Sequence, residues 1–224
     1  LDDAEFTAGP TAGAGLAAVR SGDEIAVTGS VAPGSTSTVT YRVTVLDADE
    51  RGNDLAANYL LPSGEEPPDV PRCEPVDPDA PDCTVTPIGR LFVSKAVAAD
   101  AGPVTTGTVL TYTLTFDNQS PGQASVTHTD VLDGVLDDGT LVGEPEASDP
   151  ALTVSAVTGD RFTVTGLVPA GQTITVTYRV EVNDIGDRGD NVLENFLVPT
   201  GEEPPTECVE SSPQIGRASC RERV

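Results

Sequence analysis

The chain contains an internal repeat, and this repeat limits the folds that it can adopt. The segment TVTYRV at residues 38–43 recurs unchanged at 175–180, and NYLLPSGEEPP at 58–68 recurs as NFLVPTGEEPP at 195–205. Both matches have one offset, because 175 minus 38 and 195 minus 58 both give 137. A fixed offset of this kind indicates two copies of one structural unit.

The repeat divides the 224 residues into segments. We expect residues 1–64 to be the C-terminal part of a first β-sandwich repeat whose opening third is missing. Residues 91–205 are expected to form a nearly complete second repeat. The stretch between them, 65–90, is rich in Pro, Asp and Glu, which predicts an extended, stiff linker without a packed element. Residues 206–214 would begin the next linker.

The last ten residues, 215–224, differ from the rest of the chain in being rich in arginine. They resemble the translation of a common sequencing adapter, so we expect them to be an artefact rather than natural sequence. The alternative is that IGR at 215–217 corresponds to IGR at 88–90. Ile88 follows Cys73 by 15 residues, however, whereas Ile215 follows Cys208 by 7, and this difference in spacing favours the adapter.

Apolar residues alternate with polar ones along several short segments. In ITVTYRVEV at 174–182 every second residue is apolar, which is typical of a strand with one face on a core. Segment 39–45 has the same pattern, so its apolar residues are also expected to face a core. Further strands are predicted at 91–97, 110–116, 162–164 and 193–198. Short Thr- and Val-rich strands with Gly and Pro turns predict an all-β fold of tandem antiparallel β-sandwich repeats, immunoglobulin-like or prealbumin-like.

Charge and composition exclude several functions. The chain has 12 Lys and Arg against 36 Asp and Glu, a net charge of −24, which opposes binding to nucleic acid and to anionic lipid. No apolar run approaches the roughly 18 residues of a membrane span, so no direct membrane insertion is expected in this fragment. The single histidine, His128, has no nucleophile motif near it and is expected at the surface of a strand. We therefore expect neither an enzyme nor a cofactor.

The four cysteines are Cys73, Cys83, Cys208 and Cys220, and no two of them form a CxxC pair. Zinc and thioredoxin chemistry are therefore not expected. Cys73 and Cys83 bracket the acidic linker and are expected to close a short disulfide loop, the alternative being free thiols. A disulfide fits an oxidising, extracellular setting. Cys208 would be the copy of Cys73, and Cys220 is expected to be unpaired.

Two loop motifs have a simple interpretation. Acidic loops at 47–50 and 184–191 lack the spacing of an EF-hand, so we interpret them as solvated loops and predict no metal, the alternative being calcium bound through carboxylate oxygens. The tripeptide RGD at 188–190 has the counterpart RGN at 51–53, which favours a turn over a recognition motif.

Several motifs, taken in order, resemble a known group of domains. They are VSK at 93–95, GTVLTYTLTFDN at 107–118, TDVLDGVLDD at 129–138, PAGQTITVTY at 169–178 and LEN at 193–195. In this order they are similar to the repeat domains of actinobacterial and other bacterial cell-wall surface proteins, including the family named domain of unknown function eleven. The resemblance implies a stalk or an adhesin exposed at the cell envelope.

Some surface domains of this kind form intramolecular isopeptide bonds, and three residues here have a similar arrangement. Lys95 lies in the first strand, Asp130 in a middle strand and Asn195 in the last strand of the second repeat. A buried, neutral lysine could attack the asparagine carboxamide while a protonated carboxyl group polarises the carbonyl. In the alternative, Lys95 extends to solvent at a sandwich edge, Asp130 caps a turn and Asn195 satisfies backbone groups.

We therefore expect a structural spacer of a secreted or cell-wall-attached bacterial protein. Its partners would be neighbouring repeats of the same chain. The rival hypothesis is an adhesive repeat that binds an unknown protein or glycan through its loops. Large exposed aromatic side chains, which favour the rival, are few in this sequence.

Overall fold

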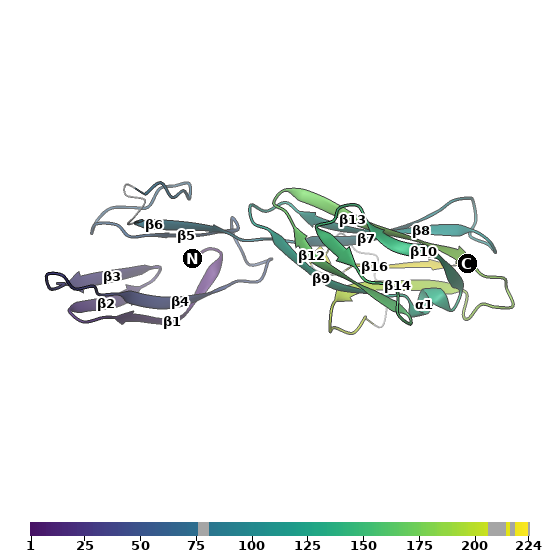
Figure 1. Ribbon diagram of the computed structural model, residues 1–224, viewed down its shortest axis with the longest axis horizontal. Helices are drawn as coiled ribbons and strands as arrows, with labels where there is room; N and C mark the ends of the chain where they lie inside the picture. The colour runs from purple at the N-terminus through teal and green to yellow at the C-terminus, as the bar shows by residue number, and fades with distance from the viewer. Residues whose placement is uncertain (76–80, 206–213, 216–217, 224) are drawn as a thin grey trace. The chain divides into compact units, whose positions relative to one another are not determined.

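The computed structural model describes residues 1–75, 81–205, 214–215 and 218–223, the last two segments by their backbone alone. The chain forms two compact units, Leu1–Thr86 and Pro87–Val224, which are called unit 1 and unit 2 below (Figure 1). Cys208 and most of the predicted second linker lie outside the described residues, as does the side chain of Cys220.

Unit 2 is an antiparallel β-sandwich, which confirms the predicted fold. One sheet has the strand order β10-β13-β8-β7-β15 and the other β11-β12-β9-β14-β16. One short helix, which the sequence did not predict, follows β9. The elements are β7 (Phe92–Ala99), β8 (Val109–Asn118), β9 (Ala124–Val131), α1 (Asp133–Leu136), β10 (Gly139–Ala147), β11 (Leu152–Val154), β12 (Arg161–Val168), β13 (Gln172–Val182), β14 (Val192–Pro199), β15 (Gln214–Ile215) and β16 (Ala218–Arg223).

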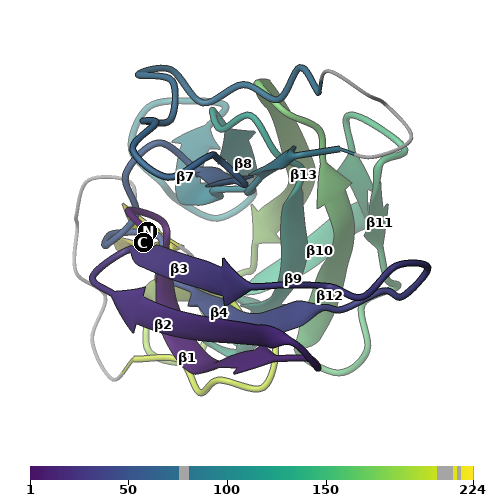
Figure 2. The same ribbon diagram turned by 90° about the vertical axis from the view of Figure 1, so that its left-hand side faces the viewer.

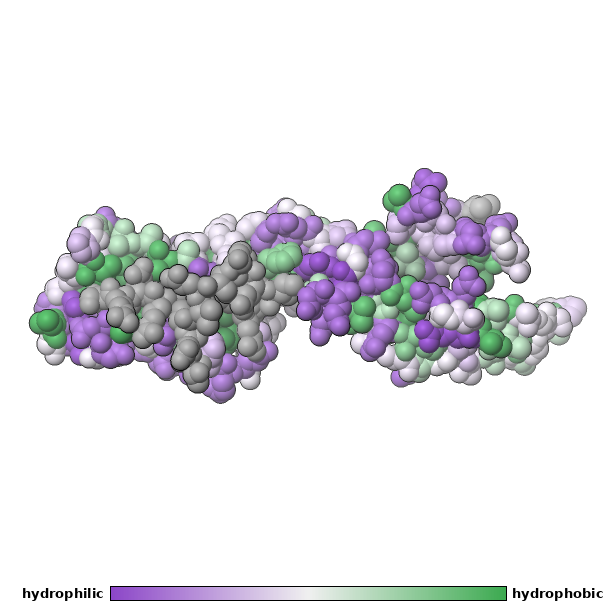
Figure 3. All heavy atoms as spheres, turned by 180° about the vertical axis from the view of Figure 1, so that it is seen from behind, coloured by the Kyte–Doolittle hydropathy of each residue, from purple (hydrophilic) through white to green (hydrophobic). Residues whose placement is uncertain are grey.

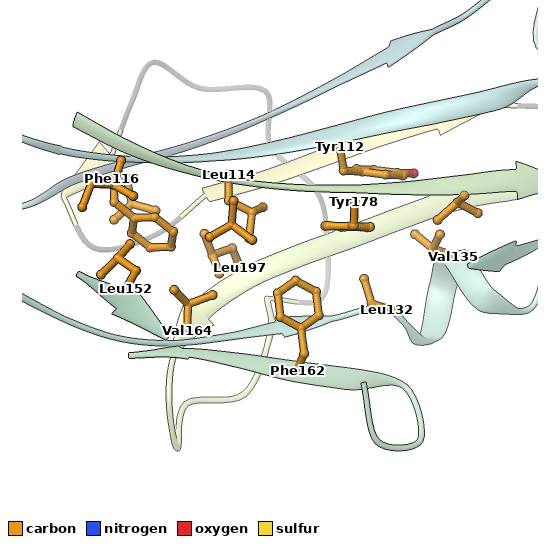
Figure 4. Packing of buried hydrophobic residues seen from close by; sticks show 14 of the residues in the cluster. Tyr112, Leu114, Phe116, Leu132, Val135, Leu152, Phe162, Val164, Tyr178 and Leu197 are labelled. Carbon is orange, nitrogen blue, oxygen red and sulfur yellow. The ribbon is translucent and has the colours of Figure 1, made fainter. Parts of the chain in front are cut away.

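The core of unit 2 lies between the two sheets. Alternation places every second residue of β8 and β13 inward, and these residues are buried. Tyr112 of β8 stacks on Tyr178 of β13 at a centroid distance of 5.1 Å. The ring of Phe162 meets Tyr178 edge-on from the opposite sheet at 5.4 Å (Figure 4). This aromatic group makes the middle of the sandwich a water-excluded environment.

The backbone of residues 218–223, within the segment expected to be an artefact, forms β16, which pairs with β14. Its pairing places Asn195 opposite Cys220 and Leu197 opposite Ala218. In unit 1, the strand formed by linker residues 83–87 pairs in the same way with the last strand of the first repeat, residues 55–59. The origin of residues 215–224 stays a prediction.

Unit 1 contains three separate two-stranded sheets, β1-β4, β2-β3 and β5-β6. Figure 2 shows β1 to β4 facing the viewer. The repeat offset matches these pairs to β10-β13, β11-β12 and β14-β16 of unit 2. The strands are β1 (Ala4–Ala12), β2 (Leu16–Ser21), β3 (Glu24–Gly29), β4 (Val39–Val45), β5 (Leu55–Tyr59) and β6 (Cys83–Pro87).

The prediction that segment 39–45 packs on a core is wrong for unit 1. Tyr41, Val43 and Val45 are 37%, 41% and 48% exposed, and apolar side chains show at the surface of this unit (Figure 3). Unit 1 has no counterpart of β7, β8 and β9 among the described residues, so no second sheet covers this face. The pattern identifies a strand, whereas burial depends on what packs against it.

The linker is also more ordered than its composition predicts. Residues 83–87 form β6, which pairs with the last strand of the first repeat, and Leu60 donates a backbone hydrogen bond to Asp82 at 2.7 Å. A disulfide joins Cys73 to Cys83 with their Cα atoms 5.4 Å apart. The Tyr59 hydroxyl donates to the Arg72 carbonyl and accepts from the Arg72 amide, both at 3.0 Å. The described residues of the linker up to residue 87 therefore fold back onto the last strand of the first repeat.

Candidate functional site

Lys95 is the only lysine in the chain, and its side chain is fully buried in the sandwich. Its position follows from the register of β7 on β8, in which Lys95 pairs with the buried Leu114. Residues directly opposite each other share a face of the sheet, so the lysine enters the core beside apolar neighbours. Lysine is almost never fully buried unless it is paired. Its burial here requires a specific partner.

That partner is Asp130, which contacts the Lys95 ammonium directly. Asp130 lies on β9 of the opposite sheet, and its side chain is also completely buried. Burial raises the pKa of the Asp130 carboxyl above its ordinary value, although the Lys95 charge and hydrogen bonding with Tyr178 oppose this. The raised pKa favours the neutral acid. The structure thus brings two of the three predicted site residues into contact.

Asn195, the third predicted residue, belongs to the same buried group. The register of β14 on β9 places Leu197 opposite Asp130, so Asn195 lies two residues along the same inward face. Its side-chain amide donates a hydrogen bond to the hydroxyl of Tyr178, and the residue is 0% exposed. Its Oδ1 atom is buried without a hydrogen-bond partner among the described residues. A bare buried carbonyl oxygen is costly and can accept a further donor.

Tyr178 contacts both the carboxyl group of Asp130 and the carboxamide of Asn195. The sequence did not predict this residue as part of the site. Burial and the nearby Asp130 charge raise the pKa of its hydroxyl well above 10, so the phenol stays protonated. It interacts with Asp130 and accepts from Asn195. Its position in the repeated TVTYRV segment predicts only a strand residue that faces inward, and does not distinguish it from other core residues. Figure 4 shows its ring between Tyr112 and Phe162.

The four residues form one continuous chain of contacts, Lys95 to Asp130 to Tyr178 to Asn195. Lys95 and Tyr178 come from one sheet, while Asp130 and Asn195 come from the other. An amine, a carboxyl group of raised pKa and a carboxamide are therefore held together in an environment without bulk water. This set of groups can exchange one amide nitrogen for another.

The other predicted features have different positions. The prediction that His128 lies at the surface is wrong, because it is 5% exposed and its ring meets Phe116 edge-on at 5.7 Å. In the RGD turn, Arg188 donates to the Asn183 carbonyl at 2.9 Å and to Thr106 Oγ1 at 2.9 Å, so its guanidinium is held by its own unit.

The acidic loop 184–191 contributes Asp190 to a cluster of three aspartates. Asp137, Asp138 and Asp190 have carboxylate oxygens within 4.8 Å of one another. Asp138 is buried and accepts the backbone amides of Asn191 at 3.2 Å and Val192 at 3.0 Å. Asp3 of unit 1 accepts the amides of Asp54 and Leu55 in the same way. The buried aspartate of each unit therefore holds the loop before the last strand.

The chain belongs to the family described as Domain of unknown function (DUF7927), which matches residues 1–88 and 90–221. The resemblance to domain of unknown function eleven is not confirmed. No curated protein matches the sequence. Among the described residues, no helix combines the length and the apolar character needed to cross a membrane.

Two solved structures are similar to parts of the chain. The collagen-binding domain of a Staphylococcus aureus adhesin is 12% identical, with a TM-score of 0.34, and the match covers 57% of this chain and 94% of that one. An inactive mutant of a GH20 exo-β-N-acetylglucosaminidase from Vibrio harveyi is 13% identical, with a TM-score of 0.28. That match covers 56% of this chain and 17% of the enzyme.

Proposed function

We propose that this chain is a non-enzymatic spacer segment of an extracellular bacterial surface protein, and that unit 2 is locked by an isopeptide bond between Lys95 and Asn195. The observation that carries the proposal is the burial of the only lysine against Asp130, in one contact network with Asn195. A fold that needed only stability would gain little from burying a charge pair, since apolar residues of similar volume often stabilise a core as well or better.

The bond would form by amide exchange. The Lys95 ammonium first passes a proton to the Asp130 carboxylate, which gives a neutral amine and a neutral acid. The amine nitrogen then attacks Cγ of Asn195 while the acid donates a hydrogen bond to Oδ1. The Nζ–Cγ bond forms, the Cγ–Nδ2 bond breaks, and Nδ2 leaves as ammonia with a proton delivered through Asp130. No oxidant or cofactor is required.

The surroundings support each step. Burial favours the neutral pair over the ion pair, because a water-excluded site disfavours both charges. Folding holds the reacting groups together, which supplies the high effective concentration that such a slow reaction needs. Tyr178 orients the Asn195 carboxamide and stays protonated throughout. The reaction would occur once per molecule, as a maturation step.

A spacer role is supported by what the surface of unit 2 offers. Among its described residues, the large apolar side chains that are exposed are Leu167 and Ile185, and neither is aromatic. Protein interfaces are enriched in Tyr, Trp and Phe at their centres. A repeat with this surface is better suited to holding other parts of the protein apart than to binding a ligand through its loops.

The test is the intact mass of the purified, folded chain. With the disulfides reduced, we expect the mass to be lower than the sequence mass by one ammonia, and tandem mass spectrometry should place the branch between Lys95 and Asn195. Lys95→Ala and Asn195→Ala should each restore the full sequence mass. Asp130→Asn, which keeps the side-chain shape but removes the acid, should also abolish the loss. A folded wild-type chain with its full sequence mass would overturn the crosslink.

A further inference from the structure

Tyr112 lies beside both sides of the proposed crosslink. It is an inward residue of β8 and is 1% exposed. Its ring stacks on the ring of Tyr178 with an interplanar angle of 7° (Figure 4). The ammonium nitrogen of Lys95 also lies over the Tyr112 ring, 5.8 Å from its centroid. One aromatic side chain therefore contacts the attacking amine and the tyrosine that holds the Asn195 carboxamide.

The strand register explains why one ring meets both groups. In its sheet, β8 lies between β7 and β13. Tyr178 of β13 is directly opposite Tyr112. On β7 the residue opposite Tyr112 is Val97, so Lys95 is a diagonal neighbour two positions along, within reach of long and aromatic side chains. The alternation that turns Tyr112 inward thus places it between the lysine and the second tyrosine.

The electrostatic attraction between the Tyr112 ring and the ammonium is weak at this distance. Cation–π contacts extend to about 6 Å from a ring centroid, and the value of 5.8 Å is close to that limit. The ring therefore does little to oppose the transfer of a proton from Lys95 to Asp130. Its larger effect is steric, because a lysine side chain has many rotamers and a closely packed ring leaves few of them open.

We propose that Tyr112 is a positioning residue for the crosslinking reaction, and that it sets the separation of the amine and the carboxamide. Its ring confines Lys95 to the conformation in which Nζ meets Asp130. Through its stack it also fixes Tyr178, whose hydroxyl accepts from the Asn195 amide. This inference rests on the proposed function, and none of the bonds exchanged involves Tyr112. Small displacements of reacting atoms slow such a step strongly, so the ring should control its rate.

The experiment times the loss of ammonia in freshly made protein. The full chain is synthesised in a cell-free system, translation is stopped, and reduced samples are taken for intact mass. Tyr112→Leu keeps an apolar side chain but removes the ring, so it should lose ammonia about tenfold or more slowly than the wild type. Tyr112→Phe keeps the ring and should react at the wild-type rate. Tyr112→Met, whose flexible side chain adapts to irregular gaps, replaces the leucine variant if that variant does not fold.

A matched control separates positioning from general packing. Phe116 lies on the same strand and the same face as Tyr112, is 0% exposed, and packs its ring edge-on against His128. Phe116→Leu also removes a core ring, so it should destabilise unit 2 to a similar extent as Tyr112→Leu. Urea unfolding in an Asn195→Ala background, where no crosslink forms, measures both losses. The rate of ammonia loss in Phe116→Leu should nevertheless match the wild type.

A second measurement detects the contact without the reaction. Lys95 is the only lysine, so isotopically labelled lysine gives a single set of side-chain NMR signals. In the Asn195→Ala background, the ring current of Tyr112 should shift the signal of the lysine ε-methylene protons upfield. Tyr112→Leu should reduce this shift, whereas Tyr112→Phe and Phe116→Leu should preserve it.

The outcomes distinguish this inference from the proposed function. An unchanged rate of ammonia loss in Tyr112→Leu, or equal slowing in Phe116→Leu, would overturn the positioning role and leave the crosslink in place. Slow reaction of Tyr112→Phe would assign the effect to the hydroxyl and overturn the role of the ring. A lysine signal without the upfield shift would overturn the contact itself. A folded wild-type chain with its full sequence mass would overturn the crosslink, and the role of Tyr112 in the reaction with it.

Discussion

The hydroxyl of Tyr178 accepts a hydrogen bond from the side-chain amide of Asn195, across the two sheets of unit 2. This contact fixes the orientation of a buried carboxamide beside an acid and an amine. In the proposed crosslinking reaction the tyrosine would be a positioning residue, because it touches both Asn195 and Asp130 and neither of the bonds exchanged involves it.

Replacing Tyr178 by Phe should slow the loss of ammonia without preventing folding. The ring and its stacking on Tyr112 remain, while the orienting hydrogen bond is removed. The free energy of unfolding should fall by about 1 kcal/mol, typical for one such bond. Time-resolved intact mass and urea unfolding provide the measurements. Tyr41→Phe, at the same repeat position in unit 1, is the control and should leave both properties of unit 2 unchanged. An unaltered rate in Tyr178→Phe would contradict the positioning role.

The stability of the uncrosslinked protein should fall as the pH rises above the ordinary pKa of aspartate. Burial raises the pKa of Asp130 in the folded state, so between 3.8 and that raised value the folded protein binds more protons than the unfolded chain. In a Lys95→Ala background, where Asp130 cannot take its proton from the lysine, the free energy of unfolding should therefore decrease with pH through this window, by at most about 1.4 kcal/mol per pH unit.

The matched comparison for this pH dependence adds Asp130→Asn to the same background. That variant should lose the component due to Asp130. Burial also raises the pKa of Asp137, as do Asp138 and Asp190, and this contribution has the same sign in both variants and cancels. Equal slopes of unfolding free energy against pH in the two variants would show that Asp130 is not the group responsible.

Removing the buried Asp138 carboxylate should destabilise unit 2 selectively. The backbone amides of Asn191 and Val192, where β14 begins, donate to it, and Asp138→Ala would leave the Asn191 amide without this acceptor and the Val192 amide with Asp190 alone. We expect a loss of about 2–3 kcal/mol, measured by chemical unfolding. Asp187→Ala, a change at an exposed position in the same loop, should alter stability by less than about 0.5 kcal/mol. Similar losses in the two variants would contradict the specific role of Asp138.

The Cys73→Ser/Cys83→Ser double variant should destabilise unit 1 and leave unit 2 unchanged. The bond closes a loop with a sequence separation of 10, for which chain entropy predicts about 2–3 kcal/mol. Trypsin cleavage after Arg72 should become faster, and the unfolding transition of unit 2 gives the internal reference. If the cleavage rate does not change, the disulfide does not hold the linker on unit 1.

The strands were predictable because alternation is a local property. Residues 174–182 read as a strand with one buried face, and the structure buries that face. The core face of β9 is different, since its inward positions 124, 126, 128 and 130 hold Ala, Val, His and Asp. Polar residues at two of these positions hide the pattern, which is why the burial of His128 could not be inferred from hydrophobicity.

The candidate site depended on another kind of information. Lys95, Asp130 and Asn195 were selected by resemblance to crosslinked domains, and alternation indicated only that Lys95 and Asn195 can face inward. Their closeness depends on the register between β7 and β8 and between β9 and β14, which involves residues far apart in the chain. Tyr178 was missed for the same reason, because its contact with Asn195 joins opposite sheets.

The Cys73–Cys83 bond also determines how the chain would respond to mechanical load. A force applied along the polypeptide passes from Cys73 to Cys83 through the sulfur atoms and bypasses residues 74–82. This acidic, proline-rich stretch therefore adds nothing to the length of the chain under tension while the bond is oxidised. A thiol–disulfide exchange reaction would release it, so the extensibility of the protein would depend on the redox state of its surroundings.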